Sequence, residues 1–282
     1  MSKKRGRSYS NSRNKKTVNG GKIALVVCIL VVCVAAVFAG IRVFSSNASA
    51  EEASRDIELS TNTITSIVSD ASEEINKGPG KTSGKVVYLT IDDGPSKFTD
   101  QMLDILKRNN AKASFFMIGP NMKAFPQQAK NIANSDSTAG FHSMSHDIHK
   151  LYTSPSAAKE EFDQCSKIFT DLTGKTSKVI RIPYGSKPNT PQASYDAMVN
   201  AGYKIWDWDI DTLDWKSNSA QILDAVKTQS VGKDNIVVLF HEKKQSLDAL
   251  EPMIKFLASE GFEFKAIGQN EVPRNYWLRN LQ

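Results

Sequence analysis

Two adjacent carboxylates, Asp92 and Asp93, stand directly before the dipeptide Gly94-Pro95. In a regular strand neighbouring side chains point to opposite faces, but a turn at Gly94-Pro95 can direct both carboxylates to one side. Two carboxylates in one pocket repel each other, so the pair predicts a neighbouring metal ion or arginine that keeps both ionised. Helix capping and turn formation by aspartate are the structural alternative.

Two of the four histidines, His142 and His146, are four residues apart. On a helical turn this spacing places both imidazoles on one side, where one metal ion can bind both. His149 is an alternative ligand, although a solvated or helix-packing role is more typical of such a residue. One carboxylate with two histidines would leave coordination positions open for water and substrate, as catalytic metal sites require.

Three further clusters carry polar or aromatic groups. The segment 181–185 combines Arg181, a permanent cation, with a rigid proline and a glycine that permits close approach to a ligand. Asp214 and Trp215 place a carboxylate beside a large apolar ring, and such rings either contact sugars or fill cores. His241 ends an apolar segment and suits acid–base chemistry near neutral pH.

Short apolar segments alternate with amphipathic ones around these clusters. Strands are expected at 85–91, 113–118, 139–143, 179–182, 203–208, 235–240 and 262–266. Helices are expected at 98–106, 122–133, 156–172, 192–201, 220–229 and 247–259. Apolar strands that alternate with helices predict a parallel sheet, and about seven of them indicate an α/β fold, a distorted, incomplete (β/α) barrel. Every cluster follows an expected strand, and catalytic groups of such barrels lie at the C-terminal strand ends.

The composition is that of a folded protein, with 282 residues, 40% hydrophobic and 23% charged. The net charge of +6 is concentrated in residues 1–22, which hold eight basic residues and no acid. The remainder is slightly acidic, and no zinc-finger spacing is present, so the charge does not predict nucleic-acid binding. Three cysteines are too few for a disulfide framework, and Cys165 is expected to be a buried apolar residue.

Residues 23–41 form an uncharged apolar run of a length that spans a bilayer as a single transmembrane helix. The positive-inside rule predicts a cytoplasmic tail at 1–22, an extracellular stalk at 42–80 and an extracellular catalytic domain at 81–282. The alternative is a secreted protein, cleaved as a signal peptide after Ala50.

The five clusters together resemble the ordered motifs of the polysaccharide deacetylase family, also called the NodB-homology family or carbohydrate esterase family four. The resemblance covers about residues 84–268. The matching segments are Thr90-Ile91-Asp92-Asp93-Gly94-Pro95, His142-Ser143-Met144-Ser145-His146, Arg181 to Gly185, Asp211-Thr212-Leu213-Asp214-Trp215 and Leu239-Phe240-His241. Two positions depart from the family: Phe141 replaces a frequent asparagine, and Thr138-Ala139 stand where an acid is common.

The resemblance implies a role for each residue. Asp93, His142 and His146 would bind one divalent metal ion, Zn²⁺ first, with Co²⁺, Ni²⁺ or Mn²⁺ as alternatives. Asp92, held by Arg181, would be the general base, and His241, tuned by Asp214, the general acid. The acetyl group would lie against Trp215 and Leu239, and the backbone N–H of Tyr184 would bind the oxyanion.

The resemblance and the predicted anchor together imply a metal-dependent N-deacetylase of cell-wall peptidoglycan, similar to membrane-anchored Gram-positive enzymes. N-acetylglucosamine is the first choice of sugar, and N-acetylmuramic acid and other polysaccharides are alternatives. An O-acetyl esterase and an inactive wall-binding module are the rival functions. The expected partners are glycan strands and the membrane, with no nucleic acid, and the protein is expected to be monomeric.

Overall fold

The computed structural model describes residues 84–282. The predicted cytoplasmic tail, transmembrane helix and stalk lie outside the described residues. Within 84–282, no helix has both the length and the apolar character required to cross a membrane.

All strands of the described residues join one sheet in which every pairing is parallel. They are β1 (Val86–Gly94), β2 (Ala113–Met117), β3 (Thr138–Phe141), β4 (Val179–Ile180), β5 (Lys204–Ile205), β6 (Ile210–Asp211), β7 (Asn235–His241) and β8 (Glu263–Phe264). Seven follow the order β5-β4-β3-β2-β1-β7-β6, and β8 pairs with the start of β1. The expected parallel sheet of about seven strands is therefore present.

The connection between β5 and β6 shows why this sheet curls. These two strands lie at opposite ends of the strand order, yet only residues 206–209 separate them in the chain. A flat sheet of seven strands would be about 29 Å wide, at about 4.8 Å per strand. Five extended residue steps reach only about 18 Å. The two edges must therefore approach each other, which gives an incomplete barrel instead of an open sheet.

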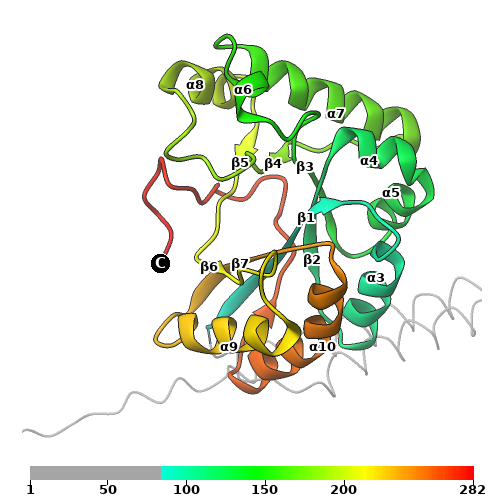
Figure 1. The fold of residues 1–282 in the computed structure, drawn as a ribbon, viewed down its shortest axis with the longest axis vertical. Helices are drawn as coiled ribbons and strands as arrows, with labels where there is room; N and C mark the ends of the chain where they lie inside the picture. Colours follow the sequence, from blue (N-terminus) through cyan, green and yellow to red (C-terminus); the bar gives the residue numbers. More distant parts are fainter. Residues whose placement is uncertain (1–83) are drawn as a thin grey trace, which may run out of the picture. The chain divides into compact units, whose positions relative to one another are not determined.

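Helices cover the outside of the curled sheet (Figure 1). They are α3 (Thr99–Arg108), α4 (Gly119–Ala124), α5 (Pro126–Ala133), α6 (Ile148–Leu151), α7 (Ala157–Thr173), α8 (Gln192–Asn200), α9 (Ser219–Gln229) and α10 (Lys244–Ser259). Helix α7 is typical: it buries Ala158, Phe162, Cys165 and Phe169 and ends at Gly174, whose φ of 69° suits glycine. Cys165 is free and buried, as expected from the sequence.

The gap between the edge strands is filled by the C-terminal segment, drawn in red in Figure 1. The side-chain amide of Asn275 donates to the carbonyl of Ile205 in β5, 3.0 Å away. Arg274 forms an ion pair of 3.1 Å with the buried carboxylate of Asp209, just before β6. Because these contacts replace strand-to-strand hydrogen bonds, the barrel is held together without being closed.

Two sequence predictions were wrong in detail. The strand expected at 203–208 is shorter, and β6 was not expected. Arg181 donates to the carbonyls of Trp206 and Asp207, both at 3.0 Å, so these groups are not available for a strand ladder. The helix expected at 122–133 is divided at Phe125, because Pro126 lacks an N–H and disfavours helical backbone in the residue before it.

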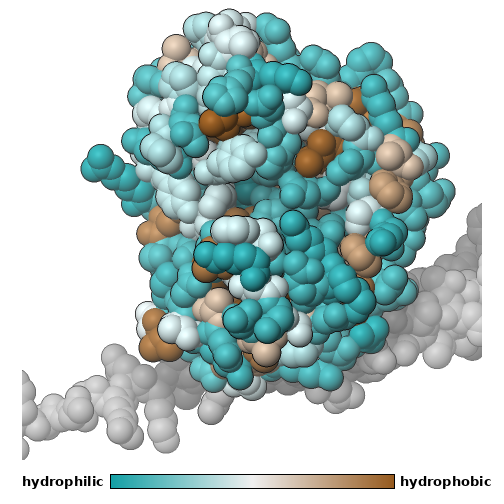
Figure 2. Space-filling view, viewed as in Figure 1, coloured by the Kyte–Doolittle hydropathy of each residue, from teal (hydrophilic) through white to brown (hydrophobic). Residues whose placement is uncertain are grey.

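The visible surface is largely hydrophilic, with hydrophobic side chains scattered over it (Figure 2). Among the large apolar side chains of the described residues, six are well exposed: Tyr184, Val199, Trp215, Val231, Val272 and Leu278. Tyr184 and Trp215 are each 58% exposed and line the same hollow, which is described next.

Candidate active site

A hollow of about 460 Å³ lies at the C-terminal ends of the strands. Its lining is Asp92, Asp93, His142, His146, Tyr184, Trp208, Asp211, Trp215, Leu239, His241 and Lys243. The residues come from the ends of β1, β6 and β7 and from the loops that follow β3, β4, β5, β6 and β7. All five sequence clusters therefore contribute side chains to one hollow.

Asp93, His142 and His146 form a group that could hold a metal ion, with ligand atoms within 4.8 Å of one another. The Oδ1 atom of Asp93 lies 3.7 Å from Nε2 of His142 and 3.5 Å from Nε2 of His146. These separations are long for hydrogen bonds. They suit atoms that each bind one ion at about 2.0–2.2 Å. Oδ1 of Asp93 is also buried without a hydrogen-bond partner, so the donor set fits a bound cation.

The environment of His142 keeps its ring neutral and oriented. Burial lowers the pKa of His142 to about 3, although the charge of Asp93 opposes this effect. Its Nδ1 lies 2.8 Å from the backbone carbonyl of Arg181, so Nδ1 carries the proton and donates to that carbonyl. Nε2 is then left unprotonated and directed toward Asp93, in the form that ligates metals.

Asp92 and Arg181 form a buried pair behind the hollow. The guanidinium of Arg181 donates to Oδ1 of Asp92 at 2.9 Å and to the hydroxyl of Thr90 at 2.6 Å. Arg181 is fully buried, and its Cζ atom lies 4.3 Å from the centroid of the Phe116 ring. Burial raises the pKa of Asp92 and outweighs the opposing effect of Arg181. The second oxygen, Oδ2, is 3.6 Å from Nε2 of His142 and is thus close to the possible metal ligands.

His241 and Asp214 form a second pair on another wall of the hollow. Nδ1 of His241 is 2.7 Å from Oδ1 of Asp214, and the backbone N–H of His241 donates to Oδ2, also at 2.7 Å. Burial alone would lower the pKa of His241, but the hydrogen bond to Asp214 and the charge of Asp92 raise it. Burial alone would raise the pKa of Asp214, but the same hydrogen bond lowers it. The Nε2 atom of His241 remains available to the hollow.

Backbone strain is concentrated around this hollow. The described residues include seven non-glycine residues with positive φ, and five of them lie at the end of β1 or in the loops that form the site. They are Asp93, Ser143, His146, Tyr184 and Leu213. Such conformations cost about 1–3 kcal/mol each and persist only where the surroundings impose them. Tyr184 lies in one of these loops and lines the hollow together with Trp215 and Leu239.

The helical turn expected from the histidine spacing is absent. His142 and His146 do converge, but the loop between them is not a helical turn, since Ser143 has φ of 71° and His146 has φ of 50°. His149, considered as an alternative ligand, is exposed and outside the metal-ligand group.

Three supporting carboxylates were not identified from the sequence. Glu161 binds the loop between the two histidines, Glu242 binds the loop after Asp93, and Asp207 accepts from Ser186, next to the Tyr184 loop. Each contacts a loop that is distant in sequence.

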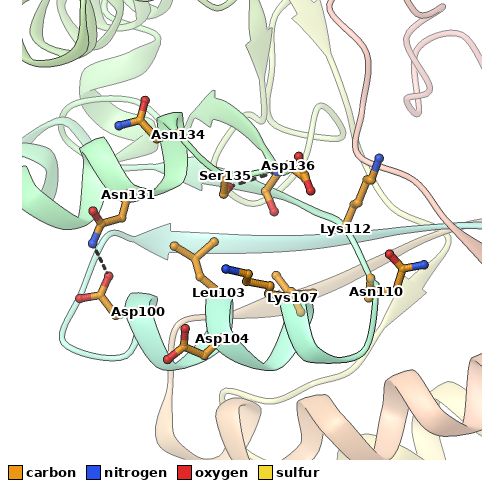
Figure 3. A pocket seen from close by; sticks show the side chains of 13 residues that line it. Asp100, Leu103, Asp104, Lys107, Asn110, Lys112, Asn131, Asn134, Ser135 and Asp136 are labelled. Carbon is orange, nitrogen blue, oxygen red and sulfur yellow. Dashed lines mark hydrogen bonds between the residues drawn. The ribbon is translucent and has the colours of Figure 1, made fainter. Parts of the chain in front are cut away.

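A second hollow, of about 500 Å³, lies between α3 and α5 (Figure 3). Three acidic residues line it, Asp100, Asp104 and Asp136, and Asp100 is bound by the amides of Gln128 and Asn131, at 3.0 and 2.7 Å. No histidine or cysteine lines this second hollow, whereas three histidines line the first.

Comparisons with known proteins agree with this geometry. Residues 79–206 match the family model described as polysaccharide deacetylase. A peptidoglycan-N-acetylglucosamine deacetylase of Bacillus cereus is 34% identical over 271 residues, which cover 92% of this chain and 97% of that protein. The crystal structure of the polysaccharide deacetylase Bc1974 from Bacillus cereus has 38% identity and a TM-score of 0.66, covering 70% of this chain and 98% of that one. A peptidoglycan-N-acetylmuramic acid deacetylase of Bacillus subtilis, PdaC, is 30% identical over 190 residues, 66% of this chain and 39% of that protein.

Proposed function

Since the chain belongs to the polysaccharide deacetylase family, we propose that it is a metal-dependent hydrolase that removes N-acetyl groups from the amino sugars of peptidoglycan. The products would be acetate and a free amino sugar. The observation that carries this proposal is the arrangement of one hollow, in which Asp93, His142 and His146 converge while Asp92 and His241 line the same space.

A divalent cation would be held by Asp93, His142 and His146, with Zn²⁺ as the first candidate and Co²⁺, Ni²⁺ or Mn²⁺ as alternatives. When bound, it would polarise the acetamide carbonyl and make an attacking water more acidic.

Asp92 is suited to accept the proton of the attacking water. Its Oδ1 is fixed by Arg181, while Oδ2 lies 3.6 Å from Nε2 of His142 in the metal group. Burial raises the pKa of Asp92, which increases the affinity of the carboxylate for a proton. Arg181 also donates to Thr90 and to two backbone carbonyls, and these hydrogen bonds fix the position of its guanidinium beside Asp92.

Attack of water on the acetamide carbonyl creates an oxyanion, and the amide nitrogen must be protonated before it can leave. The N–H of Tyr184 would donate to the oxyanion, and a single donor of this kind can contribute about 3–4 kcal/mol in the transition state. Nε2 of His241 would donate the proton to the nitrogen, because Asp214 holds Nδ1 and stabilises the imidazolium. Trp215 and Leu239 would contact the acetyl methyl group.

The names of similar proteins support N-acetylglucosamine as the sugar, with N-acetylmuramic acid second. The apolar run at 23–41 supports a location in the cell membrane, with the catalytic domain in the wall and glycan strands as its partner. Deacetylation would leave ammonium groups on the glycan, and these would repel cationic wall-degrading enzymes such as lysozyme.

Purified protein should be incubated with peptidoglycan, and both acetate and new primary amines should be measured, with and without a chelator. Equal amounts of acetate and amine, lost with chelator, are expected. Mass spectrometry of the digested muropeptides then identifies the deacetylated sugar. Acetate without amine would indicate an O-acetyl esterase. Sedimentation with wall material without acetate release would indicate a binding module. Asp92→Asn is the matched inactive control.

A further inference from the structure

The loop that joins the two predicted metal-binding histidines is conformationally strained. Ser143 and His146 both have positive φ, at 71° and 50°. Non-glycine residues in this region cost about 1–3 kcal/mol each, so the loop needs contacts that hold it. His146 is the more exposed of the two histidines, with 29% of its side chain accessible against 3% for His142.

One carboxylate from outside the site binds this loop. Glu161, in α7, accepts the consecutive backbone N–H groups of Met144 and Ser145 through Oε2, at 2.9 and 2.8 Å. Its Oε1 accepts the hydroxyl of Ser145 at 2.7 Å. Consecutive N–H groups that converge on one anion form a nest, an arrangement that fixes the backbone around the anion. The hydroxyl of Ser145 in turn accepts the N–H of Asp147 at 3.2 Å, so the contact extends past His146.

His142 is held independently of Glu161. Its backbone N–H donates to the carbonyl of Met117 at 2.8 Å, and its ring is bound to the carbonyl of Arg181. The backbone N–H of His146 has one contact within the loop, a bond of 3.0 Å to the hydroxyl of Ser143. Removal of Glu161 should therefore displace His146 relative to Asp93 and leave His142 where it is.

We propose that Glu161 is a positioning residue for metal binding, which holds the loop 143–147 in the strained conformation that directs His146 toward Asp93. This inference rests on the metal site of the proposed function. Glu161 itself lies outside the hollow and contacts neither the predicted ligand atoms nor the space for substrate. Outer groups that orient a ligand typically change metal affinity by about 10- to 100-fold.

The test measures Zn²⁺ affinity of the full-length chain by competition with a chromophoric chelator, for wild type, Glu161→Ala and Glu161→Gln. Glu161→Ala should bind Zn²⁺ about 10- to 100-fold more weakly. Glu161→Gln keeps one acceptor oxygen, so its Zn²⁺ affinity should lie between those of wild type and Glu161→Ala. Glu160→Ala is the matched control, because Glu160 is the neighbouring residue of α7 and is exposed. The melting temperature of the metal-free protein should be unchanged in Glu161→Gln, which separates positioning from loss of fold.

Zn²⁺ affinity in Glu161→Ala within twofold of wild type would overturn the proposal, as would an equal loss in Glu160→Ala. Because the readout is metal affinity and not acetate release, it also separates the two proposals. Wild type that binds Zn²⁺ but releases no acetate would refute the deacetylase function and leave the role of Glu161 standing. Wild type that binds no Zn²⁺ would remove both.

Discussion

Asp214→Asn should weaken proton donation by His241 without removing the imidazole. Asp214 presents two acceptor oxygens, one to Nδ1 of His241 and one to its backbone N–H, both at 2.7 Å. An amide has only one acceptor oxygen and no charge, so one of these bonds is lost and the imidazolium loses its counter-charge. Ser246, whose hydroxyl also donates to Asp214, keeps the new side chain in the same place.

The size of the effect follows from the burial of this pair. The Asp214 side chain is 1% exposed and that of His241 is 18% exposed, so solvent screens the pair weakly. A hydrogen bond to a charged group contributes about 1.5–3 kcal/mol, against about 0.5–1.5 kcal/mol for a neutral one. The difference of about 1–2 kcal/mol corresponds to a rate of acetate release about 5- to 30-fold lower where protonated His241 is limiting.

The direction of the pKa shift of His241 predicts how Asp214→Asn changes the pH dependence of activity. The pKa of His241 is raised, so its acid form persists above the ordinary value of 6.5 and is lost as pH rises through the raised pKa. Without the carboxylate that pKa falls, so the alkaline limb of the activity profile should move to lower pH. The same pair contributes to the free energy of unfolding. Since the pKa of Asp214 is lowered from 3.8 and that of His241 is raised from 6.5, this contribution is complete between pH 3.8 and 6.5. Asp214→Asn should therefore lower the melting temperature more at pH 5.5 than at pH 9.

Acetate release from peptidoglycan, measured from pH 5 to 10, is the assay. Asp248→Asn is the control, since Asp248 is on the neighbouring helix α10, is 46% exposed and pairs with Lys244. An unmoved alkaline limb with an unchanged rate would refute the assignment of His241 as the acid that Asp214 tunes.

Three further changes test the scaffold and the metal site. Gly94→Ala should lower the free energy of unfolding in urea by about 1–3 kcal/mol, because the new Cβ would lie 1.9 Å from Oε1 of Glu242, a side chain whose other oxygen, Oε2, is held by the hydroxyls of Ser96 and Thr99. Unchanged stability would show that the Glu242 side chain moves aside at no cost. Arg181→Lys should cost about 3–5 kcal/mol by the same measurement, since an ammonium cannot reproduce the planar fork that binds Asp92, and a near-neutral result would contradict this. Removal of metal with a chelator should abolish acetate release and lower the melting temperature, by an amount equivalent to about 2.7 kcal/mol if the metal had been present at 100 times its Kd; full activity in chelator would refute the metal-dependent mechanism.

The sequence was sufficient to predict the parallel sheet because its long strands are continuous apolar runs with turn residues at their ends. β1 and β7 are examples, since each is buried along most of its length. β6 was missed because it has only two residues, and nothing local distinguishes Ile210–Asp211 from the preceding loop. The strand forms because β7 offers a partner edge, and because the C-terminal segment binds the backbone between β5 and β6, where the N–H of Asp207 donates to the carbonyl of Arg274 at 2.8 Å. Both causes are distant in the chain.

The residues of the hollow were predictable because they stand in clusters after strands, whereas the groups that hold them were not. Glu161 illustrates the difference. It lies three residues after Ala158 and four before Cys165, both of which are buried, so helical spacing places it beside the apolar stripe of α7. A charge at such a position is a signal that it has a partner, but the identity of that partner requires the fold.

Three carboxylates, Asp92, Asp93 and Asp214, are grouped around the predicted metal ligands and His241. A fourth, Asp211, lines the hollow together with the cation Lys243, and these two opposite charges cancel. Asp92 is paired with Arg181, and Asp214 is paired with His241 in its protonated form, so each pair is close to neutral. Asp93 is the remaining charge among the predicted metal ligands, because burial keeps His142 neutral. A divalent cation bound there would therefore leave a net charge of about +1 in a largely buried space. That excess lies where an oxyanion would form, and a fixed positive charge stabilises developing negative charge more strongly in a site with little water. A second unpaired carboxylate would cancel this positive charge. The ion pairs of Asp92 with Arg181 and of Asp214 with His241 therefore preserve the charge that would stabilise the oxyanion.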